Sequence, residues 1–423
     1  MKVLVVGGGG REHAVIKSLK KNKKVEKIYA LPGNGGIAKD AECFPVKATD
    51  VEGIVDFVKT HSVDFAVVTP DDPLVLGCVD ALEELGIACF GPRKNAAIIE
   101  GSKVFSKDLM QKYGIPTAHS KTFTNAEDAI EYLKAGDFPA VIKADGLALG
   151  KGVIIAQNFE EAKSAVCEIM CDKIFGASGN SILVEEFLTG PEVSVLSFTD
   201  GNTVVPMVSS MDHKRARDND EGLNTGGMGT VAPNPYFTEE IARECMEKIF
   251  LPTVRAMKAE GRTFKGCLYF GLMLTPKGPK VIEYNCRFGD PETQVVLPLL
   301  ESDLLEIMTA VSEERLSPDM VKFKKGAACC VVLASDGYPK KYESGFEITL
   351  PETNGDEEIY VAGARTEDEK LLTSGGRVLG AVGVADDLKS AIAKAYALSD
   401  KIHFKNAYKR SDIGQRALKA KGE

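Results

Sequence analysis

Polar side chains alternate near the end of one apolar segment, KVIEYNCRFGDPETQ at 280–294. Its first residues have the pattern of a β-strand, in which side chains two positions apart lie on the same face. Glu283 and Asn285 would therefore present a carboxylate and an amide oxygen together. Mg²⁺ prefers such hard oxygen ligands and usually shares them with substrate phosphates. Arg287 follows on the same face if the strand continues, where a guanidinium could bind a phosphoryl group or a substrate carboxylate.

The E-x-N spacing has little specificity by itself. The segment RFGDPET follows directly and contains several charged residues. A purely structural role for this segment is therefore disfavoured, because a buried strand gains nothing from several charges near its end. We therefore predict a metal and phosphate site where this strand ends.

The chain opens with KVLVVGGGGREHA at 2–14, in which four glycines separate an apolar strand from a helix. Free N–H groups and the positive end of the helix dipole make this loop a candidate anion site, although a tight packing turn would have the same pattern. The dinucleotide fingerprint G-x-G-x-x-G would need glycine where Glu12 or His13 stands. The second strand also ends at LPGNGG, 31–36, without an acid for a ribose hydroxyl. A nicotinamide-dependent oxidoreductase is therefore disfavoured.

A second glycine loop lies in AVIKADGLALGKGVIIA, 140–156, between two β-branched runs. This pattern predicts a hairpin tip and not a P-loop, which would need GK[ST] at the start of a helix. Lys143 on one flank and Lys151 at the turn could bind a triphosphate, with solvated surface lysines as the alternative. Lys143 interrupts an apolar strand, which favours the phosphate interpretation.

An extended connector follows in ILVEEFLTGPEVSV, 182–195, with two acids at a strand end and Glu192 after a Gly-Pro turn. Its backbone could bind an adenine edge and a carboxylate could bind ribose hydroxyls. Acids on the protein surface would give the same pattern.

The composition limits the partners. The 423 residues include 52 Lys and Arg and 61 Asp and Glu, a net charge of −9, which opposes non-specific nucleic-acid binding and favours small-molecule ligands. Ten cysteines occur without a C-x-x-C pair, as in reduced core thiols. The first apolar strand is too short for a secretory core, and no apolar run approaches the roughly 20 residues of a membrane helix. We expect a cytoplasmic protein without membrane contact.

The length predicts two or three packed domains. Residues 1–101 alternate β-branched runs with amphipathic stretches, a parallel α/β pattern that closes with a helical stretch around 95–110. Residues 102–325 contain a small subdomain at about 120–190, with strand hairpins around one helix at 125–135, and a long helix at 238–260. We expect Pro252 and Pro298 to kink their helices. Residues 326–423 form a closing domain.

Six segments together resemble the phosphoribosylamine–glycine ligases (glycinamide ribonucleotide synthetases) of the ATP-grasp superfamily, over essentially the whole chain. They are GGREHA at 9–14, EGSKVFSKD at 100–108, VIKADGLALGKGV at 141–153, MDHKRARD at 211–218, NTGGMG at 224–229 and IEYNCRFGDPETQ at 282–294. The resemblance implies an α/β and α+β multidomain fold: a Rossmann-like pre-ATP-grasp N-terminal domain, an ATP-grasp domain with a mobile lid subdomain, and a small C-terminal α+β domain. It further implies a monomer that ligates glycine to 5-phosphoribosylamine with ATP and Mg²⁺ or Mn²⁺, in purine biosynthesis.

The resemblance also implies roles for particular residues. The ATP-binding candidates are Lys103, Lys143, Gly150, Lys151, Gly152, Glu185, Glu186, Phe187, Leu188 and Glu192, and the metal ligands are Glu283 and Asn285. The substrate-binding candidates are Gly8, Gly9, Gly10, Arg11, Asp71, Asn224, Gly226, Gly227 and Asp290. The catalytic candidates, for contacts to the sugar, glycine or the acyl phosphate, are Arg287, Asp212 and Lys214.

The sequence departs from the family pattern at Gly8, Thr69, Asp71, Met211 and Leu223, where the family commonly has Asn, Gly, Glu, Gln and Pro. These departures concern the sugar site most. Three alternatives remain on the residues alone: another carboxylate–amine ligase or a biotin-dependent carboxylase of the same superfamily, a nicotinamide-dependent oxidoreductase, and a nucleotide-binding regulator without catalysis.

Overall fold

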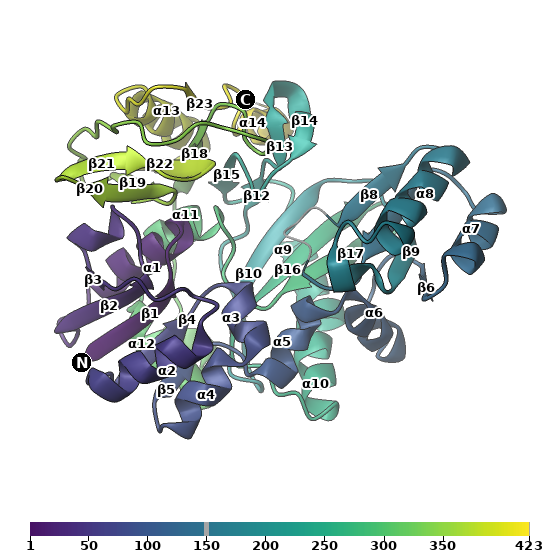
Figure 1. Cartoon of the computed structure of the whole chain (residues 1–423), viewed down its shortest axis with the longest axis horizontal. Coiled ribbons are helices and arrows are strands. Elements are labelled where there is room, and N and C mark those ends of the chain that lie inside the picture. The colour runs from purple at the N-terminus through teal and green to yellow at the C-terminus, as the bar shows by residue number, and fades with distance from the viewer. Residues whose placement is uncertain (148–151, 423) are drawn as a thin grey trace.

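The computed structural model describes residues 1–147 and 152–422 and shows four main sheets (Figure 1). The N-terminal sheet is parallel, in the order β3-β2-β1-β4-β5. Its strands are β1 (Lys2–Gly7), β2 (Lys27–Pro32), β3 (Glu42–Cys43), β4 (Phe65–Val68) and β5 (Ala88–Phe90). Its helices are α1 (Gly10–Leu19), α2 (Val51–Thr60), α3 (Asp71–Leu76) and α4 (Cys78–Glu84). The strand order reverses direction at β1, and ligands of such sheets bind beyond the carboxyl ends of the strands at this point.

The central sheet is antiparallel, in the order β11-β10-β16-β17. Its strands are β10 (Glu192–Thr199), β11 (Val204–Pro206), β16 (Gly266–Thr275) and β17 (Gly278–Asn285). The register between β16 and β17 shifts near the functional segment: Gly271 pairs with Glu283, but Leu272 pairs with Val281. Ile282 is therefore the extra residue of a β-bulge, a device that redirects side chains beside active sites.

The small sheet is also antiparallel, in the order β6-β9-β7-β8, and lies on the far side of the central sheet from the N-terminal sheet (Figure 1). Its strands are β6 (Ser120–Phe123), β7 (Ala140–Ala144), β8 (Val153–Ala156) and β9 (Ile182–Glu186). The predicted hairpin at 140–156 is confirmed by the β7–β8 pairing. The prediction of one helix in this subdomain was wrong, because α8 (Phe159–Val166) accompanies α7 (Ala126–Lys134). Two of the three buried residues of α8 are alanines, which give little hydrophobic contrast in the sequence.

The helical stretch predicted around 95–110 is two helices, α5 (Lys94–Gly101) and α6 (Lys103–Lys112). Ser102 separates them with an extended backbone, and its hydroxyl accepts a hydrogen bond from Phe105 N at 3.1 Å, a typical N-cap. The predicted long helix is α9 (Glu239–Cys245) and α10 (Leu251–Ala259), joined by a π-helical turn, Met246–Phe250, which ends two residues before Pro252. Pro298 lies in a 3-10 turn, Leu297–Leu299, between α11 (Thr293–Val296) and α12 (Leu304–Ser312).

The C-terminal sheet has the order β12-β15-β18-β22-β19, with β23 also paired to β18. Its strands are β12 (Met211–Asp212), β15 (Gly229–Ala232), β18 (Ala327–Ser335), β19 (Glu357–Val361), β22 (Arg377–Ala385) and β23 (Ala407–Tyr408). Two separate hairpins, β13 (Arg215–Arg217) with β14 (Glu221–Asn224) and β20 (Ala364–Glu367) with β21 (Lys370–Thr373), and the helices α13 (Leu388–Ser399) and α14 (Gln415–Lys421) complete this part. The segment 211–232 thus leaves the central sheet and joins strands from the end of the chain. Among the described residues, no helix is long and apolar enough to cross a membrane.

The core beneath the central sheet is aromatic. Phe270 on β16 is fully buried, with its ring centroid 4.4 Å from that of Phe250 and 5.6 Å from that of Tyr284. These contacts join the π-helical turn to the strand that carries Glu283.

We predict that Phe270→Ala lowers the free energy of unfolding by about 3–5 kcal/mol, because it removes a buried ring and leaves a cavity. Ile174→Ala, at a side chain that is 53 % exposed, is the matched control and should change it by less than about 0.5 kcal/mol. Denaturant titration followed by circular dichroism measures both values. Equal losses in the two variants would contradict the assigned core.

Candidate functional site

Glu283 on β17 is surrounded by cations from separate elements. Its carboxylate lies 4.0 Å from Lys214 Nζ and is 34 % exposed. Burial raises the pKa of Glu283, but the positive charges of Lys214, Lys143, Lys103 and Arg287 outweigh it and hold the pKa below its usual range. Glu283 therefore stays ionised near neutral pH, as a metal ligand must.

Glu100, the next-to-last residue of α5, holds the side chains that follow Glu283 on the chain. One of its carboxylate oxygens accepts from Asn285 Nδ2 at 3.1 Å and lies 3.1 Å from Arg287 Nη2. The other accepts from Cys286 N at 2.7 Å. Because the amide nitrogen of Asn285 also donates to Tyr284 O at 2.9 Å, its oxygen remains available as a ligand. Sequence analysis did not select Glu100, although it begins the segment EGSKVFSKD.

Two buried lysines share one carboxylate behind the metal-ligand strand. Lys143 Nζ lies 3.0 Å from Glu185 Oε2, and Lys107 Nζ lies 3.3 Å from Glu185 Oε1. Lys143 also donates at 3.1 Å to the carbonyl of Ile282, the bulge residue. Burial lowers the pKa of Lys107 to about 8. Lys107 was missed by sequence analysis, yet its four-residue spacing from Lys103 on a helix was an available signal.

Lys103, at the first position of α6, reaches the glycine loop after β7. Its ammonium donates to Gly146 O at 2.7 Å, and burial lowers its pKa even though the charge of Glu283 acts in the opposite direction. Asp145 in the same loop accepts from Ser102 Oγ at 3.0 Å and from Val104 N at 3.2 Å. Lys103 is thus fixed at the root of the predicted phosphate loop.

The tip of that loop is only partly described. Gly152 O accepts from Ala144 N at 2.8 Å, which closes the hairpin. The predicted contacts of Gly150 and Lys151 fall on residues outside the described part of the chain.

The connector after β9 extends from the small sheet toward the central sheet. Glu186 accepts from His119 N at 2.9 Å and from Lys280 Nζ at 2.7 Å, while Phe187 is 39 % exposed. Leu188 precedes the turn that leads into β10. Glu192, the first residue of β10, is an acceptor for Lys214 Nζ at 3.2 Å. The connector therefore ends at the same lysine that faces Glu283.

The N-terminal glycine loop lines a pocket of about 490 Å³, and the residues around it are Gly7, Gly8, Gly9, Arg11, Glu12, Pro32, Gly33, Lys47, Ala48, Thr49, Pro70 and Asp290. A Cβ at Gly8 would lie 2.3 Å from Gly33 O, so this backbone path requires glycine there. Two N–H groups of the loop have acceptors within the protein: Gly9 N donates to Glu12 Oε2 at 2.6 Å and Arg11 N to Asp290 Oδ2 at 3.4 Å. An anion in this pocket must compete with these carboxylates.

The side chains nearest this pocket are also engaged. Arg11 donates to Glu12 Oε1 at 2.6 Å and to Phe288 O at 3.0 Å. Lys47 is exposed at the rim and was not selected from the sequence. Asp71 begins α3, and together with Glu100 its charge raises the pKa of Arg287 above the ordinary value, against the opposing effect of burial. Arg287 Nε is buried and has no hydrogen-bond partner among the described residues.

Asp212 and Glu292 form a pair of interacting acids. Burial, followed by the charge of Glu292, raises the pKa of Asp212 well above its usual value. Glu292 is buried and accepts from Tyr269 OH at 3.1 Å, and Tyr269 OH lies 2.8 Å from Ser194 Oγ. Glu292 and Tyr269 were not selected from the sequence, and Tyr269 reads there as an ordinary core residue of β16.

Arg377 joins two predicted substrate loops from the C-terminal sheet. Its Nη1 donates to Gly226 O at 2.8 Å, to Gly227 O at 3.4 Å and to Asp290 O at 2.8 Å. Burial raises the pKa of Asp290, but the charges of Arg377 and Arg11 lower it below its usual value. Asn224, at the end of β14, is exposed. No local sequence signal pointed to Arg377, which is distant in the chain from both loops.

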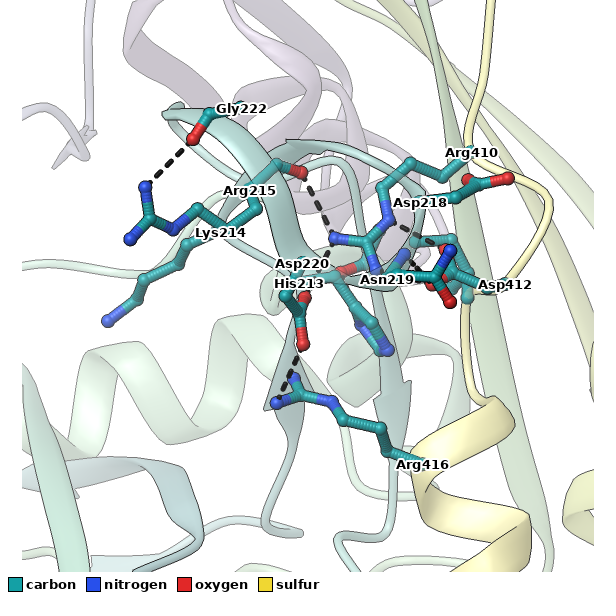
Figure 2. Close-up of polar contacts among 12 residues, drawn as sticks. His213, Lys214, Arg215, Asp218, Asn219, Asp220, Gly222, Arg410, Asp412 and Arg416 are labelled. Atoms are coloured by element: carbon teal, nitrogen blue, oxygen red, sulfur yellow. Dashed lines mark hydrogen bonds and ion pairs between the residues drawn. The ribbon is translucent and has the colours of Figure 1, made fainter. Parts of the chain in front are cut away.

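His213 separates Asp212 from Lys214 and points into the protein (Figure 2). Its Nε2 accepts from Gly414 N at 3.1 Å, which leaves Nδ1 to donate to Gly229 O at 3.2 Å. Burial, followed by the charges of Arg416 and Arg410, lowers the pKa of His213 to about 4. The neutral imidazole is therefore a structural link between this segment and the end of the chain.

The donor set fits a divalent cation that is partly held by nucleotide phosphates. Glu283 provides an ionised carboxylate and Asn285 an oriented amide oxygen. In the described part of the chain, no group of three or more His, Cys, Asp or Glu residues could hold a metal alone. The remaining ligands would have to be phosphate oxygens and water, which is usual for Mg²⁺.

Three family profiles match the chain. They are the N domain of phosphoribosylglycinamide synthetase over residues 1–100, its ATP-grasp (A) domain over 101–293 and its C domain over 328–416.

Relatives that match this chain over nearly its full length are phosphoribosylamine–glycine ligases. The phosphoribosylamine–glycine ligase of Caldanaerobacter subterraneus subsp. tengcongensis is 48 % identical over 413 residues, which cover 98 % of this chain and 99 % of the relative. That of Listeria monocytogenes serotype 4b is 48 % identical over 421 residues, or 99 % of this chain and all of the relative.

Solved structures extend the comparison to the fold. The crystal structure of phosphoribosylamine–glycine ligase from Thermotoga maritima superposes with a TM-score of 0.87 at 35 % identity, covering 98 % of this chain and 100 % of that one. The biotin carboxylase domain of the Hydrogenobacter thermophilus 2-oxoglutarate carboxylase, crystallised with MgADP and bicarbonate, has a TM-score of 0.75 at 19 % identity, covering 99 % and 93 %. The second likeness concerns the ATP-grasp fold alone.

We predict that His213 makes stability depend on pH. Its folded pKa of about 4 lies below the ordinary value of 6.5, so the unfolded state binds more protons between these values. Stability should therefore fall as pH decreases from about 6.5 toward 4, by up to about 1.4 kcal/mol per pH unit from this group. Unfolding free energies of the wild type and His213→Gln, measured across this range, should converge at low pH. His119→Gln, at an exposed position, controls for loss of an imidazole, and parallel wild-type and His213→Gln curves would contradict the prediction.

Proposed function

The chain belongs to the phosphoribosylglycinamide synthetase family, and on this premise we propose that it ligates glycine to 5-phosphoribosylamine, with cleavage of ATP to ADP and phosphate, in purine biosynthesis. One observation supports the proposal most strongly. Lys103, Lys143, Lys214 and Arg287 come from separate segments of the chain, and their charges all act on the carboxylate of Glu283. Such a concentration of cations beside an oxygen-donor pair suits the polyphosphate of a nucleotide.

The chemistry needs no nucleophilic side chain. The carboxylate of glycine resists attack by an amine, so transfer of the γ-phosphoryl group of ATP to it would give glycyl phosphate and ADP. The amine of phosphoribosylamine would then attack the acyl carbon and release phosphate. Lys103, Lys143 and Arg287 would stabilise charge on the moving phosphoryl group, mainly by electrostatics and positioning.

The connector after β9 is our proposed adenosine site. The backbone from Glu185 to Leu188 would bind adenine, and Glu192 would bind the ribose. Glu185 itself is committed to Lys107 and Lys143, so its side chain would act by holding these two cations.

We place the sugar phosphate in the pocket of about 490 Å³ beside the glycine loop. Gly8, Gly9, Gly10 and Arg11 approach from one side, and Lys47 provides an exposed cation at the rim. Asp71, Asn224, Gly226, Gly227 and Asp290 are the proposed further contacts. Asp212 would lie near the amine and glycine.

Glu283 and Asn285 would hold Mg²⁺ or Mn²⁺ together with the nucleotide. A bound divalent cation neutralises charge on the phosphates and aligns them for transfer. Glu100 would maintain the site by keeping the amide oxygen of Asn285 free. We propose a monomer as the working unit. The ten cysteines are free thiols, as is usual for a cytoplasmic protein.

The decisive experiment supplies purified protein and Mg-ATP with freshly generated phosphoribosylamine, and then adds glycine, other small amino acids or bicarbonate. We expect ADP release to require both phosphoribosylamine and glycine. ADP release with bicarbonate in the absence of glycine would instead support a carboxylase.

We predict that Glu283→Gln lowers the rate of ADP formation by at least about 100-fold, because the variant loses the charge that binds the metal. The midpoint of thermal unfolding should remain close to that of the wild type. Glu244→Gln, which removes a partly exposed carboxylate paired with Lys248, is the matched control and should retain activity. A Glu283→Gln enzyme with wild-type turnover would refute the metal assignment.

A further inference from the structure

Lys214 lies between His213, which is hydrogen-bonded to Gly229 O and Gly414 N, and the β13–β14 hairpin. The hairpin is a separate two-stranded sheet whose second strand is exposed along its whole length. Two-stranded hairpins are marginally stable in water without packing against another element. His213 anchors the residue before Lys214, so contacts outside the hairpin are needed to anchor the residues that follow it.

Arg410, near the end of the chain, supplies this support. Its side chain is 1 % exposed and lies against the hairpin (Figure 2). Nη1 donates to Arg215 O at 3.0 Å and to Asp220 Oδ1 at 3.0 Å. Nε and Nη2 form a two-pronged contact with Asp412, at 2.7 and 2.8 Å. Arg410 thus connects both ends of the β13–β14 turn region to the C-terminal segment.

Neighbouring contacts also attach the hairpin to the end of the chain. Asp412 also accepts from Asn219 N at 2.8 Å, and Asp218 accepts from Ser411 N at 2.8 Å. Arg416 Nη1 lies 3.2 Å from Asp220 Oδ2, and its Nη2 donates to Asp212 O at 3.4 Å. The hairpin is therefore attached to residues 410–416 on both sides of its turn. In Figure 2, Lys214 extends away from these carboxylates.

We propose that Arg410 is a positioning residue for the ligase reaction: it holds the hairpin through Asp220 and Arg215 O, and thereby places the Lys214 ammonium between Glu192 and Glu283. This inference rests on the role proposed above for Lys214. Arg410 acts through Lys214 and contacts neither substrate nor metal. A planar guanidinium is required, because a lysine cannot hold the two-pronged Asp412 contact and also reach Arg215 O and Asp220.

The test compares Arg410→Lys, Lys214→Met and the double variant by steady-state ADP formation. We expect Arg410→Lys to lower kcat by about 10- to 100-fold, as is typical when a residue that orients a site is lost. The double variant should be no slower than Lys214→Met alone, because the two substitutions remove the same interaction. A merely structural role would instead make the two losses multiply.

A second substitution covers the case in which Arg410→Lys does not fold. Asp220→Asn changes a carboxylate that is 34 % exposed and should show the same non-additivity with Lys214→Met. Arg217→Gln is the matched control, since Arg217 lies in the same hairpin but contacts Asp336 and the ring of Tyr408. It should retain wild-type kcat.

The outcomes distinguish the role proposed for Lys214 from the role proposed for Arg410. Full activity in Lys214→Met would show that Lys214 has no role, and the proposal for Arg410 would fall with it. An impaired Lys214→Met together with multiplied losses, or with full activity in Arg410→Lys, would overturn the proposal for Arg410 alone.

Discussion

The site depends on keeping several cations close together around the carboxylate of Glu283. Like charges repel, and three of these cations are paired with further acids: Lys143 with Glu185, Lys214 with Glu192, and Arg287 with Glu100. Burial strengthens the Lys143–Glu185 interaction, because little water screens it. A polyphosphate ligand could take over these partners, since its oxygens provide the same charge in the same place.

Backbone irregularities place the charged groups as much as regular structure does. The bulge at Ile282 gives Lys143 a carbonyl to bind, beside the strand that carries Glu283. The interruption of the helices at Ser102 puts Lys103 in the first turn of α6, within reach of Gly146 O. Each irregularity interrupts a backbone pattern and fixes one lysine. Local backbone geometry therefore sets the spacing of the cations.

The end of the chain contacts segments of the site that lie 87 to 195 residues earlier. Arg377 joins the loops of Gly226 and Asp290, and Arg410 supports the hairpin beyond Lys214. These contacts are possible because the segment 211–232 leaves the central sheet and pairs with β18. The C-terminal part thus does more than close the fold, which is how its sequence was interpreted.

The sequence by itself determined the family, the parallel N-terminal sheet, the hairpin around Lys143 and the strand that carries Glu283 and Asn285. These features follow from local periodicity and from contiguous motifs. It did not reveal α8 or the helix break at Ser102. It also did not reveal the contacts made in the site by Glu100, Lys107, Glu292 and Arg377. Only the tertiary structure decided these, because the value of a buried charge depends on which distant group neutralises it, and chain folding alone brings those groups together.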